Sequence, residues 1–477
     1  MITLFICIGV LVAGYFVYGR FVEKTFGADV SRETPAITKQ DGVDFMPLKL
    51  SKIFLIQFLN IAGLGPIFGA IAGALWGPAA FLWIVFGCIF AGTVHDYFSG
   101  MLSMRHGGQS IPEIVGRYLG QGVRQFMRYF SIGLLILVGV VFVKGPASIL
   151  QELTGFNVSI LIGCIFLYYL LATLIPIDKL IGKIYPFFGM CLLVMAVGLF
   201  FTLVFGDYTV PELTLGTFRN MHENPEKYPL FPMLFVTIAC GAVSGFHSTQ
   251  SPLMARCISN EMDGRKVFIG AMITEGIVAL IWAAVAMAFF GGIEKLAETM
   301  AVEGHNAAWV VNIICNTMLG KIGGILAIFG VVAAPITSGD TAFRSARITI
   351  ADSFNIDQSK LLKRLWVTIP MFVLAFVLTK VNFAIIWRYF GWSNQVLATI
   401  VLWAATVYMR QRGAKYWFLL IPSAFMTMVV AAYILVSPEG FALSYVISVI
   451  VSLLVALLLS TWVVLLKSKK HLNAKAA

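Results

Sequence analysis

Charged residues are scarce in this chain of 477 residues. They make up 12% of it, whereas soluble globular proteins carry about 25%. So few charges cannot cover the surface of one or two soluble domains of this length, and 59% of the residues are hydrophobic. This composition excludes a soluble enzyme, a disordered chain and a nucleic-acid-binding protein, and it indicates that much of the surface faces lipid.

Cysteine is also scarce, with seven residues and no C-x-x-C pair. Most of the cysteines fall in apolar stretches, while Cys257 lies in an inner loop and Cys315 in an outer segment. Because no second partner lies outside, the cysteines are predicted to be small buried apolar residues rather than a disulfide or zinc framework. The first apolar stretch lacks a basic leader and a small-residue cleavage pattern, so we expect an uncleaved helix rather than a signal peptide.

Apolar windows of about 20 residues, the length that crosses a bilayer core about 30 Å thick, recur along the whole chain. They predict thirteen membrane-spanning helices and hence an all-α membrane protein. The windows are Ile2–Gly19, Ile53–Trp76, Ala80–Ser103, Tyr129–Leu150, Val158–Ile175, Ile184–Phe205, Phe231–Leu253, Val267–Gly291, Ile322–Thr341, Leu365–Thr379, Phe383–Met409, Tyr416–Val436 and Phe441–Leu466. Two more segments are predicted to be surface helices, Ile111–Phe126 inside and Ile293–Met318 outside, and the outer one is open between a lid and a plain connection.

The net charge of +11 follows the predicted topology. With the N-terminus outside, every second loop is basic and holds residues such as Arg105, Arg265 and Arg412, whereas the intervening loops are acidic or neutral. Cytoplasmic loops carry the excess of Lys and Arg in membrane proteins. The pattern therefore places the N-terminus outside and the C-terminus, with its basic tail, inside.

Two windows contain Gly- and Pro-rich sequence near mid-depth, in residues 63–69 and 241–252. Backbone that leaves a helix within a bilayer is tolerated only beside a buried site or a water-filled cavity, although Gly and Pro are common in membrane helices in any case. Free N–H groups at such points suit an anionic group, and free carbonyls suit a cation. The residues predicted to bind substrate are Gly63, Gly65, Gly69, Gly241, Ser244, Gly245, His247, Thr249 and Gln250.

The two interruptions lie five windows apart, so they enter the membrane with opposite orientations. Paired broken helices in inverted halves are the best sequence pointer to the central site of a transporter. The spacing predicts a LeuT-like 5+5 inverted repeat with one preceding and two following helices. The predicted segments are 1–50 for the first helix and inner loop, 51–205 for the first repeat, 206–230 for an outer loop, 231–409 for the second repeat, and 410–477 for two helices and the basic tail.

Ionisable residues inside membrane spans are costly and usually functional. In residues 335–341 a carboxylate follows several hydroxyl groups on one predicted helix, which in LeuT-type folds faces the first broken helix and forms a cation site with it. The residues predicted to manage a coupling proton or sodium ion are Asp340, Ser338, Thr341 and Thr337. A buried structural pair of Asp340 with Arg344, four residues further on, is the alternative.

His247 lies in the second interruption, where an imidazole can change its charge near neutral pH or donate to a carboxylate. A neutral histidine that satisfies a free carbonyl is the alternative interpretation.

A gate or proton path is predicted at His95, Asp96, Lys144 and Glu275. For His95 and Asp96, near the inner end of their window, a loop-anchoring hydrogen bond or a pair with Arg105 is the alternative. Lys144, like Arg388 in a later window, is open between a contact with a substrate carboxylate and an extended conformation that reaches the outer surface.

Three motifs in fixed order carry a resemblance to a known family. They are NIAGLGPIFG at 60–69, VHDYFSG at 94–100 with RHGGQSI at 105–111, and GAVSGFHSTQSP at 241–252. These motifs resemble the carbon starvation protein A (CstA) family, compact subgroup, within the amino acid–polyamine–cation superfamily. The resemblance implies a bacterial inner-membrane secondary transporter associated with uptake of peptides and of pyruvate, with protons. The chain is much shorter than the larger family members, so the residue roles above rest on the physical argument.

The sequence thus predicts a secondary active transporter, not an enzyme, that takes up small carboxylates such as pyruvate, or short peptides, by alternating access. No cofactor is expected beyond a coupling ion, H⁺ or Na⁺, and the expected partners are a small-molecule substrate and the lipid bilayer, without nucleic acid. An intramembrane protease is disfavoured, because Thr337 stands where a GxGD pattern needs Gly and no HExxH occurs.

A starvation sensor of transporter ancestry, and a carrier of another small solute or of a divalent metal ion, are the remaining alternatives. Asp340, His247, His95 and Cys240 are residue types that bind metals, but their spacing matches no metal motif, so no metal site is predicted.

Overall fold

The structure, a computed structural model, describes residues 1–41, 45–174, 177–303, 305–354, 356 and 361–466. The predicted basic tail after residue 466 lies outside the described residues. The helices are α1 (Ile2–Phe16), α2 (Tyr18–Phe26), α3 (Pro35–Thr38), α4 (Leu50–Ala62), α5 (Ala70–Gly73), α6 (Ala79–Gly87), α7 (Thr93–Arg105), α8 (Ile111–Leu119), α9 (Gln121–Thr154), α10 (Val158–Leu174), α11 (Ile177–Phe205), α12 (Phe235–Thr237), α13 (Gly245–Ala255), α14 (Gly270–Phe289), α15 (Ile293–Ala301), α16 (Ala307–Leu326), α17 (Ala334–Ser353), α18 (Leu361–Leu378), α19 (Phe383–Gln411), α20 (Trp417–Val436) and α21 (Tyr445–Leu465).

Short turns of tighter or wider helix join several of these elements. They are η1 (Gly65–Gly69), η2 (Ala74–Trp76), η3 (Cys88–Gly92), η4 (Leu230–Leu234), η5 (Glu261–Asp263), η6 (Arg265–Ile269) and η7 (Ala327–Ala333).

Within the described residues, eight helical segments are long and apolar enough to cross a membrane, and nine if the bent pair of α4 and residues 65–76 is one span. The windows at α18, α19 and the α12–α13 segment are not among them, and α10 contributes a shorter apolar helix, Val158–Ala172. The chain is therefore an all-helical multi-span membrane protein, as predicted, with fewer spans by these criteria than the thirteen apolar windows.

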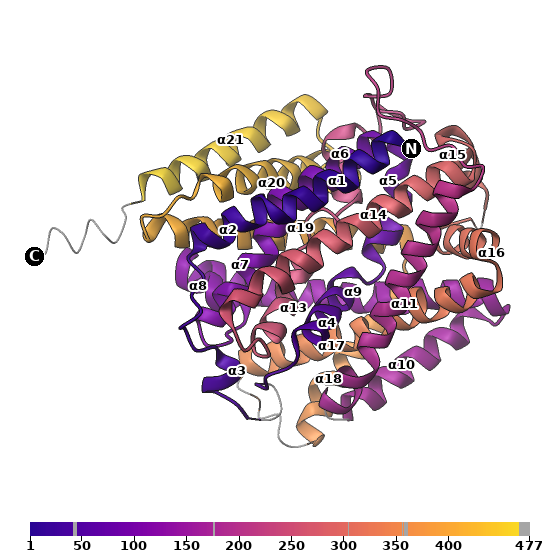
Figure 1. Cartoon of the computed structure of the whole chain (residues 1–477). Coiled ribbons are helices and arrows are strands. Elements are labelled where there is room, and N and C mark those ends of the chain that lie inside the picture. The colour runs from indigo at the N-terminus through magenta and orange to yellow at the C-terminus, as the bar shows by residue number, and fades with distance from the viewer. Residues whose placement is uncertain (42–44, 175–176, 304, 355, 357–360, 467–477) are drawn as a thin grey trace, which may run out of the picture.

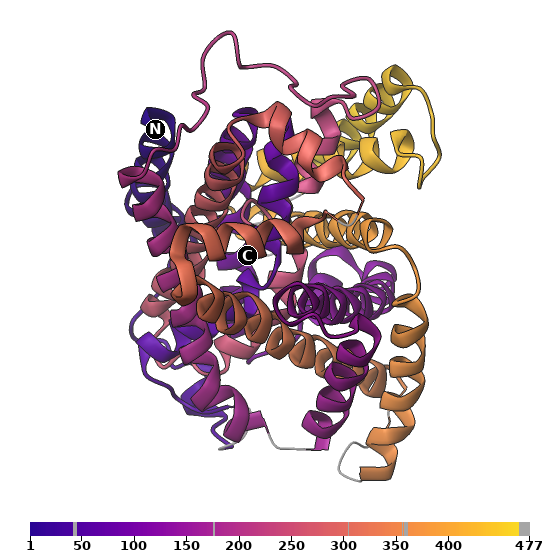
Figure 2. The same cartoon turned by 90° about the vertical axis from the view of Figure 1, so that its right-hand side faces the viewer.

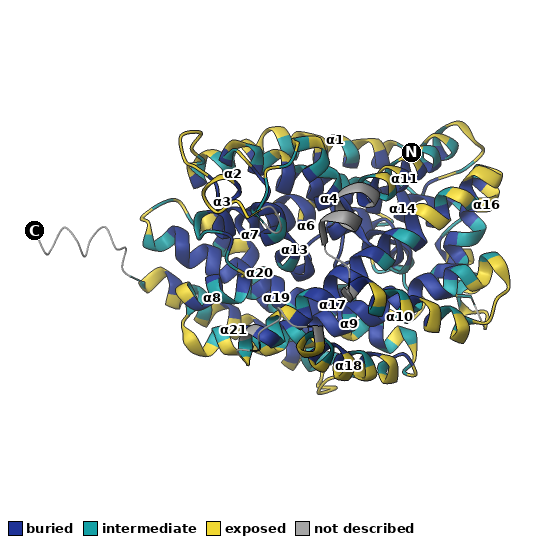
Figure 3. Cartoon of the chain, turned by 90° about the horizontal axis from the view of Figure 1, so that it is seen from below, coloured by how far each residue is buried: buried dark blue, intermediate teal, exposed yellow. Residues whose placement is uncertain are grey.

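Large apolar side chains lie uncovered on the outside of the bundle, on helices such as α1, α18 and α21. Phe5 is 49% exposed, Trp366 79% and Leu458 70%. Figure 3 shows buried residues filling the interior and exposed ones around the perimeter. Contiguous exposed apolar surface of this kind marks a membrane or partner contact, and here it surrounds the bundle.

The two ends of the bundle carry different elements. The N-terminus, α15 and α16 lie at one end, and α3 and α8 at the other (Figure 1). Figure 2 looks onto the end with α15 and α16. Residues 111–119 and 293–318 thus lie at opposite ends of the bundle.

The two predicted surface helices differ from the observed ones in extent. α8 ends at Leu119, Gly120 adopts a left-handed φ of 95°, and α9 already begins at Gln121, so the predicted helix Ile111–Phe126 was too long. The outer segment Ile293–Met318 is two helices, α15 and the first part of α16, rather than one.

The helix that carries Asp340 continues beyond the predicted window Ile322–Thr341. α17 extends to Ser353, and it holds Arg344 and Arg347 with only 9% and 6% of each residue exposed. Basic residues ordinarily mark the end of a span, whereas this helix runs through them and keeps them inside the protein.

Candidate functional site

The first interruption is a true break in the helix, and we call residues 63–69 the first break. α4 ends at Ala62, Gly63 has φ 45° and ψ −135°, and η1 begins at Gly65. A residue with a side chain rarely adopts that conformation, and a Cβ at Gly63 would lie 2.7 Å from the ring of Phe142. The helix axis bends by 50° here, as the Gly-rich sequence predicted.

The second interruption is longer, and we call residues 238–244 the second break. α12 ends at Thr237 and α13 begins at Gly245, with a tight turn in which the N–H of Val243 donates to the carbonyl of Ala239 at 2.8 Å. The predicted second interruption is thus present. α13 starts inside the protein, with Ser244 and Gly245 fully buried at its N-terminus.

The two breaks pack directly against each other. A Cβ built on Gly65 would lie 2.2 Å from the Cβ of Cys240, and one on Gly69 would lie 3.1 Å from the carbonyl oxygen of Thr237. The indole N–H of Trp83 donates to the carbonyl of Ile238 at 2.8 Å and ties the second break to α6. Only glycine at position 65 allows this approach, which explains the Gly-rich first break.

Four ionisable side chains from three helices form one buried network beside the second break: His95 and Asp96 on α7, His247 on α13 and Glu275 on α14. All four are 0% exposed. His247 Nδ1 lies 2.9 Å from Asp96 Oδ2, and His95 Nδ1 lies 2.8 Å from Asp96 Oδ1. An ionised carboxylate only accepts, so with Asp96 charged both imidazoles donate to it through Nδ1. The structure therefore unites residues that the sequence assigned separately to a gate and to the substrate site.

Glu275 completes the buried network on the far side of His247. Its Oε1 accepts the N–H of Gly241 at 3.1 Å, and its Oε2 lies 3.4 Å from His247 Nε2. The alternative pair of Asp96 with Arg105 was wrong, because Arg105 Nε donates to Glu261 Oε1 at 2.7 Å near the end of the bundle that carries α8.

Asn394 on α19 caps the start of α13, a role that the sequence analysis missed. Its Oδ1 accepts the N–H of Phe246 at 2.5 Å, and its Nδ2 donates to Ser244 Oγ at 2.8 Å. The side chain thus satisfies one free N–H donor of the half-helix from another element. A signal was present, since residues 393–395 are three adjacent polar residues inside an apolar window.

Two other residues predicted to bind substrate, Thr249 and Gln250, differ in whether all their side-chain polar atoms are hydrogen-bonded. Thr249 Oγ1 donates to the carbonyl of Phe246 at 2.7 Å within its own helix, and Gln250 Nε2 donates to Thr249 Oγ1 at 2.9 Å. Gln250 Oε1 is buried and has no hydrogen-bond partner among the described residues.

Two residues of α4 that the sequence analysis did not select behave like Gln250. Gln57 Nε2 lies 3.3 Å from Ser251 Oγ on α13, and its Oε1, like Asn60 Oδ1, is buried without a hydrogen-bond partner in the described part of the chain. The helices α4 and α13, each next to a break, therefore share a polar surface.

The residues predicted for ion coupling on α17 point in different directions. Ser338 Oγ lies 3.4 Å from the carbonyl oxygen of Leu59 on α4, so α17 does face the first broken helix. Tyr185 on α11 donates to the carbonyl of Thr337 at 2.9 Å and lies 3.3 Å from Thr341 Oγ1.

Asp340 does not share the contact that Ser338 makes with α4. Its Oδ2 lies 3.4 Å from Arg344 Nη2, and the same Arg344 nitrogen donates to the carbonyl of Ala172 on α10 at 3.0 Å. The alternative of a buried pair with Arg344 is therefore present in the structure.

Lys144 and Arg388 lie apart from the buried network. Lys144 Nζ donates to the carbonyl of Val381 at 2.5 Å, in the loop between α18 and α19. Arg388 Nη2 pairs with Glu439 Oε1 at 2.5 Å, in the loop between α20 and α21. Both cations reach loop groups at the ends of their helices, in line with the alternative of an extended conformation.

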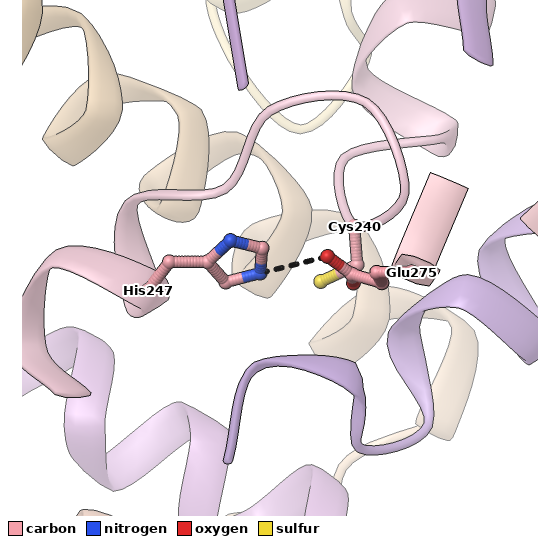
Figure 4. A group of neighbouring side chains, drawn as sticks. All are labelled: Cys240, His247 and Glu275. Carbon is pink, nitrogen blue, oxygen red and sulfur yellow. Dashed lines mark ion pairs between the residues drawn. The ribbon is translucent and has the colours of Figure 1, made fainter. Parts of the chain in front are cut away.

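Three side chains that could bind a metal ion converge at the second break. Cys240 Sγ, His247 Nε2 and a Glu275 carboxylate oxygen all lie within 4.8 Å of one another, and all three residues are buried. Figure 4 shows the imidazole of His247 pointing at the Glu275 carboxylate, with the Cys240 thiol beside it. The sequence predicted no metal site because Cys240 and His247 share one window, Glu275 stands in the next, and their spacing matches no metal motif.

A polar cavity of about 690 Å³ opens near the inner end of α13. It lies between α8, α9, α13 and α17, and its lining includes Glu113, Arg128 and Arg256. Arg128 pairs with Glu113 at 2.5 Å, and Arg256 donates to the carbonyl of Gly108 at 3.0 Å. The cavity lies at the end of the bundle that carries α8.

Solved structures with similar folds are membrane transporters. A Na⁺-coupled sialic acid symporter in its substrate-bound outward-open state matches with a TM-score of 0.55 at 14% identity, over 98% of each chain. A histidine-to-alanine mutant of the Eremococcus coleocola manganese transporter matches with a TM-score of 0.54 at 11% identity, over 87% of this chain and 93% of that one. At these identities the likeness shows the LeuT-like fold alone.

Curated relatives are similar in sequence. An uncharacterized membrane protein of Haemophilus influenzae is 45% identical over 350 residues, which cover 63% of this chain and 94% of the relative. The peptide transporter CstA of Bacillus subtilis is 25% identical over 88% of each chain. The pyruvate/proton symporter BtsT of Escherichia coli is 27% identical over 57% of this chain and 47% of the symporter, so the match spans about half of that protein.

The family described as Carbon starvation protein CstA matches residues 1–162, 135–385 and 305–433, which together take in most of the chain. The three motifs, the LeuT-like fold and this match agree. The chain belongs to the CstA family of membrane transporters.

Proposed function

We propose that the protein is a secondary active transporter that takes up small carboxylates such as pyruvate, or short peptides, together with protons, by alternating access. The observation that carries the proposal is the direct contact of two broken helices, Gly65 against Cys240, beside buried polar side chains. The names of the relatives, peptide transporters and a pyruvate/proton symporter, support this substrate class.

The substrate site is proposed at the start of α13 and on the polar surface between α4 and α13. Backbone N–H groups at a helix N-terminus favour an anionic group. Asn394 Oδ1 now accepts from Phe246 N–H, so a substrate carboxylate would compete with this amide for the same donors. Buried side chains with unused polar atoms, Gln57, Asn60 and Gln250, would bind the rest of a small polar solute.

Coupling is proposed at Asp340. A proton on its carboxylate would weaken the pair with Arg344 and loosen the tie from Arg344 to the carbonyl of Ala172 on α10. The helix α17 also contacts α4 through Ser338 and Leu59, so a shift of α17 would reach the first break. Sodium held near Ser338 is the competing possibility, and the transport assay below separates the two.

The finer architecture is proposed as thirteen spans with an inverted pair of five-helix repeats, residues 51–205 and 231–409. The first and second breaks stand at corresponding places in these repeats, which supports the assignment. The alternation of basic and acidic loops supports an outside N-terminus and an inside C-terminus in the bacterial inner membrane. A role of Lys144 in a gate or proton path, and of the outer helices as a lid, stay predictions.

The test is uptake of labelled pyruvate and of a labelled dipeptide into proteoliposomes under an inward proton gradient, a sodium gradient or neither. Accumulation of either solute against its gradient, driven by protons only, is the expected result. Absence of accumulation of both solutes under all three conditions would refute the proposed substrate class. Asp340→Asn is expected to abolish proton-driven accumulation while it preserves exchange of internal for external substrate.

A further inference from the structure

The proposed function leaves two deeply buried atoms unused at the second break. His247 Nε2 and Glu275 Oε2 form only a long ion pair with each other, at 3.4 Å; both residues are 0% exposed, and neither atom makes a hydrogen bond in the described residues. Buried polar atoms are nearly always satisfied, and each exception needs a physical reason. A group that binds both atoms at once would supply that reason.

We propose that Cys240, His247 and Glu275 bind a transition-metal dication of the zinc class. Two N or O ligands at zinc distances of 2.0–2.1 Å and tetrahedral angles lie about 3.4 Å apart. That separation equals the observed one between His247 Nε2 and Glu275 Oε2. A thiolate ligand stands about 3.6 Å from such atoms, and all three donor atoms already lie within 4.8 Å of one another (Figure 4).

Neighbouring groups orient these ligands as outer-shell groups do in metal sites. Asp96 accepts from His247 Nδ1, which fixes the tautomer and turns the lone pair of Nε2 toward Glu275 and Cys240. The N–H of Gly241 holds the other oxygen of Glu275, and Asn394 Nδ2 lies 3.8 Å from Cys240 Sγ. A donor beside the sulfur stabilises a thiolate, the form that binds metal.

Charge balance favours a cation at this place. Asp96 and Glu275 bring two carboxylates into a fully buried region, and within the described residues their recorded hydrogen bonds and ion pairs include no Lys or Arg. Buried charge is costly unless it is paired or coordinates a metal. A bare imidazolium–carboxylate bond is the competing arrangement, but such bonds measure about 2.7–2.9 Å, shorter than the 3.4 Å found here.

The chemical types of the three ligands determine which metal ions the site would prefer. A thiolate with an imidazole favours zinc-class ions over Mg²⁺, Ca²⁺ or Mn²⁺, which prefer oxygen. Three protein ligands leave the fourth position of a tetrahedral ion open. If the transport proposal holds, on which this last step rests, that position would receive the carboxylate of the substrate at the breaks.

The test uses the purified full-length protein in nanodiscs, stripped with a chelator and titrated with Zn²⁺ or Co²⁺ alone. One tightly bound equivalent is expected, with the near-ultraviolet thiolate-to-cobalt band. Cys240→Ser should remove the band, Glu275→Gln should weaken binding about 100-fold or more, and Asp96→Asn about 10- to 100-fold. Cys315→Ala removes a buried thiol outside the site and should change nothing. Wild-type cobalt spectra without a thiolate band would overturn the proposal.

A second measurement needs no variant and guards against misfolding. Zn²⁺ should protect Cys240 of the wild-type protein from a small alkylating reagent, as read by mass spectrometry, while the labelling of Cys164 is unchanged. Equal labelling of Cys240 with and without Zn²⁺ would also overturn the proposal. Metal binding is measured without transport, so a metal site in a protein that fails to carry pyruvate or dipeptide would refute the transport proposal alone.

Discussion

The contact between the two breaks can be tested by adding a single methyl group at Gly65. A Cβ at this position would lie 2.2 Å from the Cβ of Cys240 and 2.3 Å from its Sγ. Carbon atoms in contact are ordinarily about 3.5–4.0 Å apart, so Gly65→Ala forces the breaks to separate by more than about 1 Å. Overpacking of this kind costs about 1–3 kcal/mol. The cost should be near the upper end, because the Cβ of Cys240 is fixed to the backbone and cannot rotate away.

The assay is thermal unfolding of the purified protein in detergent, with a chelator present to exclude metal. Gly65→Ala should lower the Tm, whereas the matched control Gly133→Ala should leave it unchanged or raise it, because nothing lies within 4 Å of a Cβ there. In the Gly65→Ala background, Cys240→Gly should restore most of the loss, because it removes both clashing atoms. Cys240→Ala should restore little, because it keeps the Cβ.

Two outcomes would refute this reasoning. Equal Tm values for Gly65→Ala and Gly133→Ala would show that the breaks are not in contact. Full recovery with Cys240→Ala would show that only the sulfur opposes the methyl group, and that the backbones of the two breaks are further apart than the structure has them.

Two matched pairs of substitutions test buried polar contacts, one at the start of α13 and one near the end of the bundle that carries α8. Asn394→Ala leaves the N–H of Phe246 without its acceptor, and a buried unsatisfied donor costs about 1–3 kcal/mol, so the Tm should fall while Asn394→Asp, which keeps the acceptor, should fall less. Glu261→Gln breaks the buried pair with Arg105, at a cost of about 3–5 kcal/mol, whereas Asp263→Asn affects only an exposed pair worth about 0–1 kcal/mol. Similar Tm values for these last two variants would contradict the burial of the Arg105 pair.

The breaks were predictable because their signal is local. Gly63 and Gly65 stand beside Pro66, and Gly241, Gly245 and Pro252 recur in a short stretch, so the interruptions follow from backbone chemistry within a few residues. The apolar windows are local in the same sense. Their number exceeds the eight or nine helical segments that are long and apolar enough to cross a membrane in the part of the chain that the structure describes.

The buried network was not predictable, because its contacts join distant parts of the chain. His247 and Asp96 are separated by 151 positions, and no spacing rule links α7, α13 and α14. The sequence identified Asp96, His247 and Glu275 individually as costly intramembrane groups. The packing of α7 against α13, and of α14 against the first break, brings these groups into contact. Each buried ionisable group is then stabilised by the others.

Two of the predicted coupling residues on α17, Ser338 and Asp340, point in different directions because of the helix geometry. At 3.6 residues per turn, Ser338 and Asp340 point about 160° apart. Ser338 accordingly meets Leu59 on α4, while Asp340 meets Arg344. The residues of the predicted coupling set therefore face two different neighbours in the structure.

This separation yields the sharpest test of the coupling ion. If protons drive transport through Asp340, Asp340→Asn should abolish accumulation under a proton gradient, and Ser338→Ala should leave the driving ion unchanged, because its hydroxyl contacts only carbonyl groups. If sodium binds between α17 and α4, the order reverses, and Ser338→Ala raises the sodium concentration needed for half-maximal uptake. A parallel loss of proton-driven uptake in both variants, with intact substrate exchange, would contradict the division of α17 into two sites.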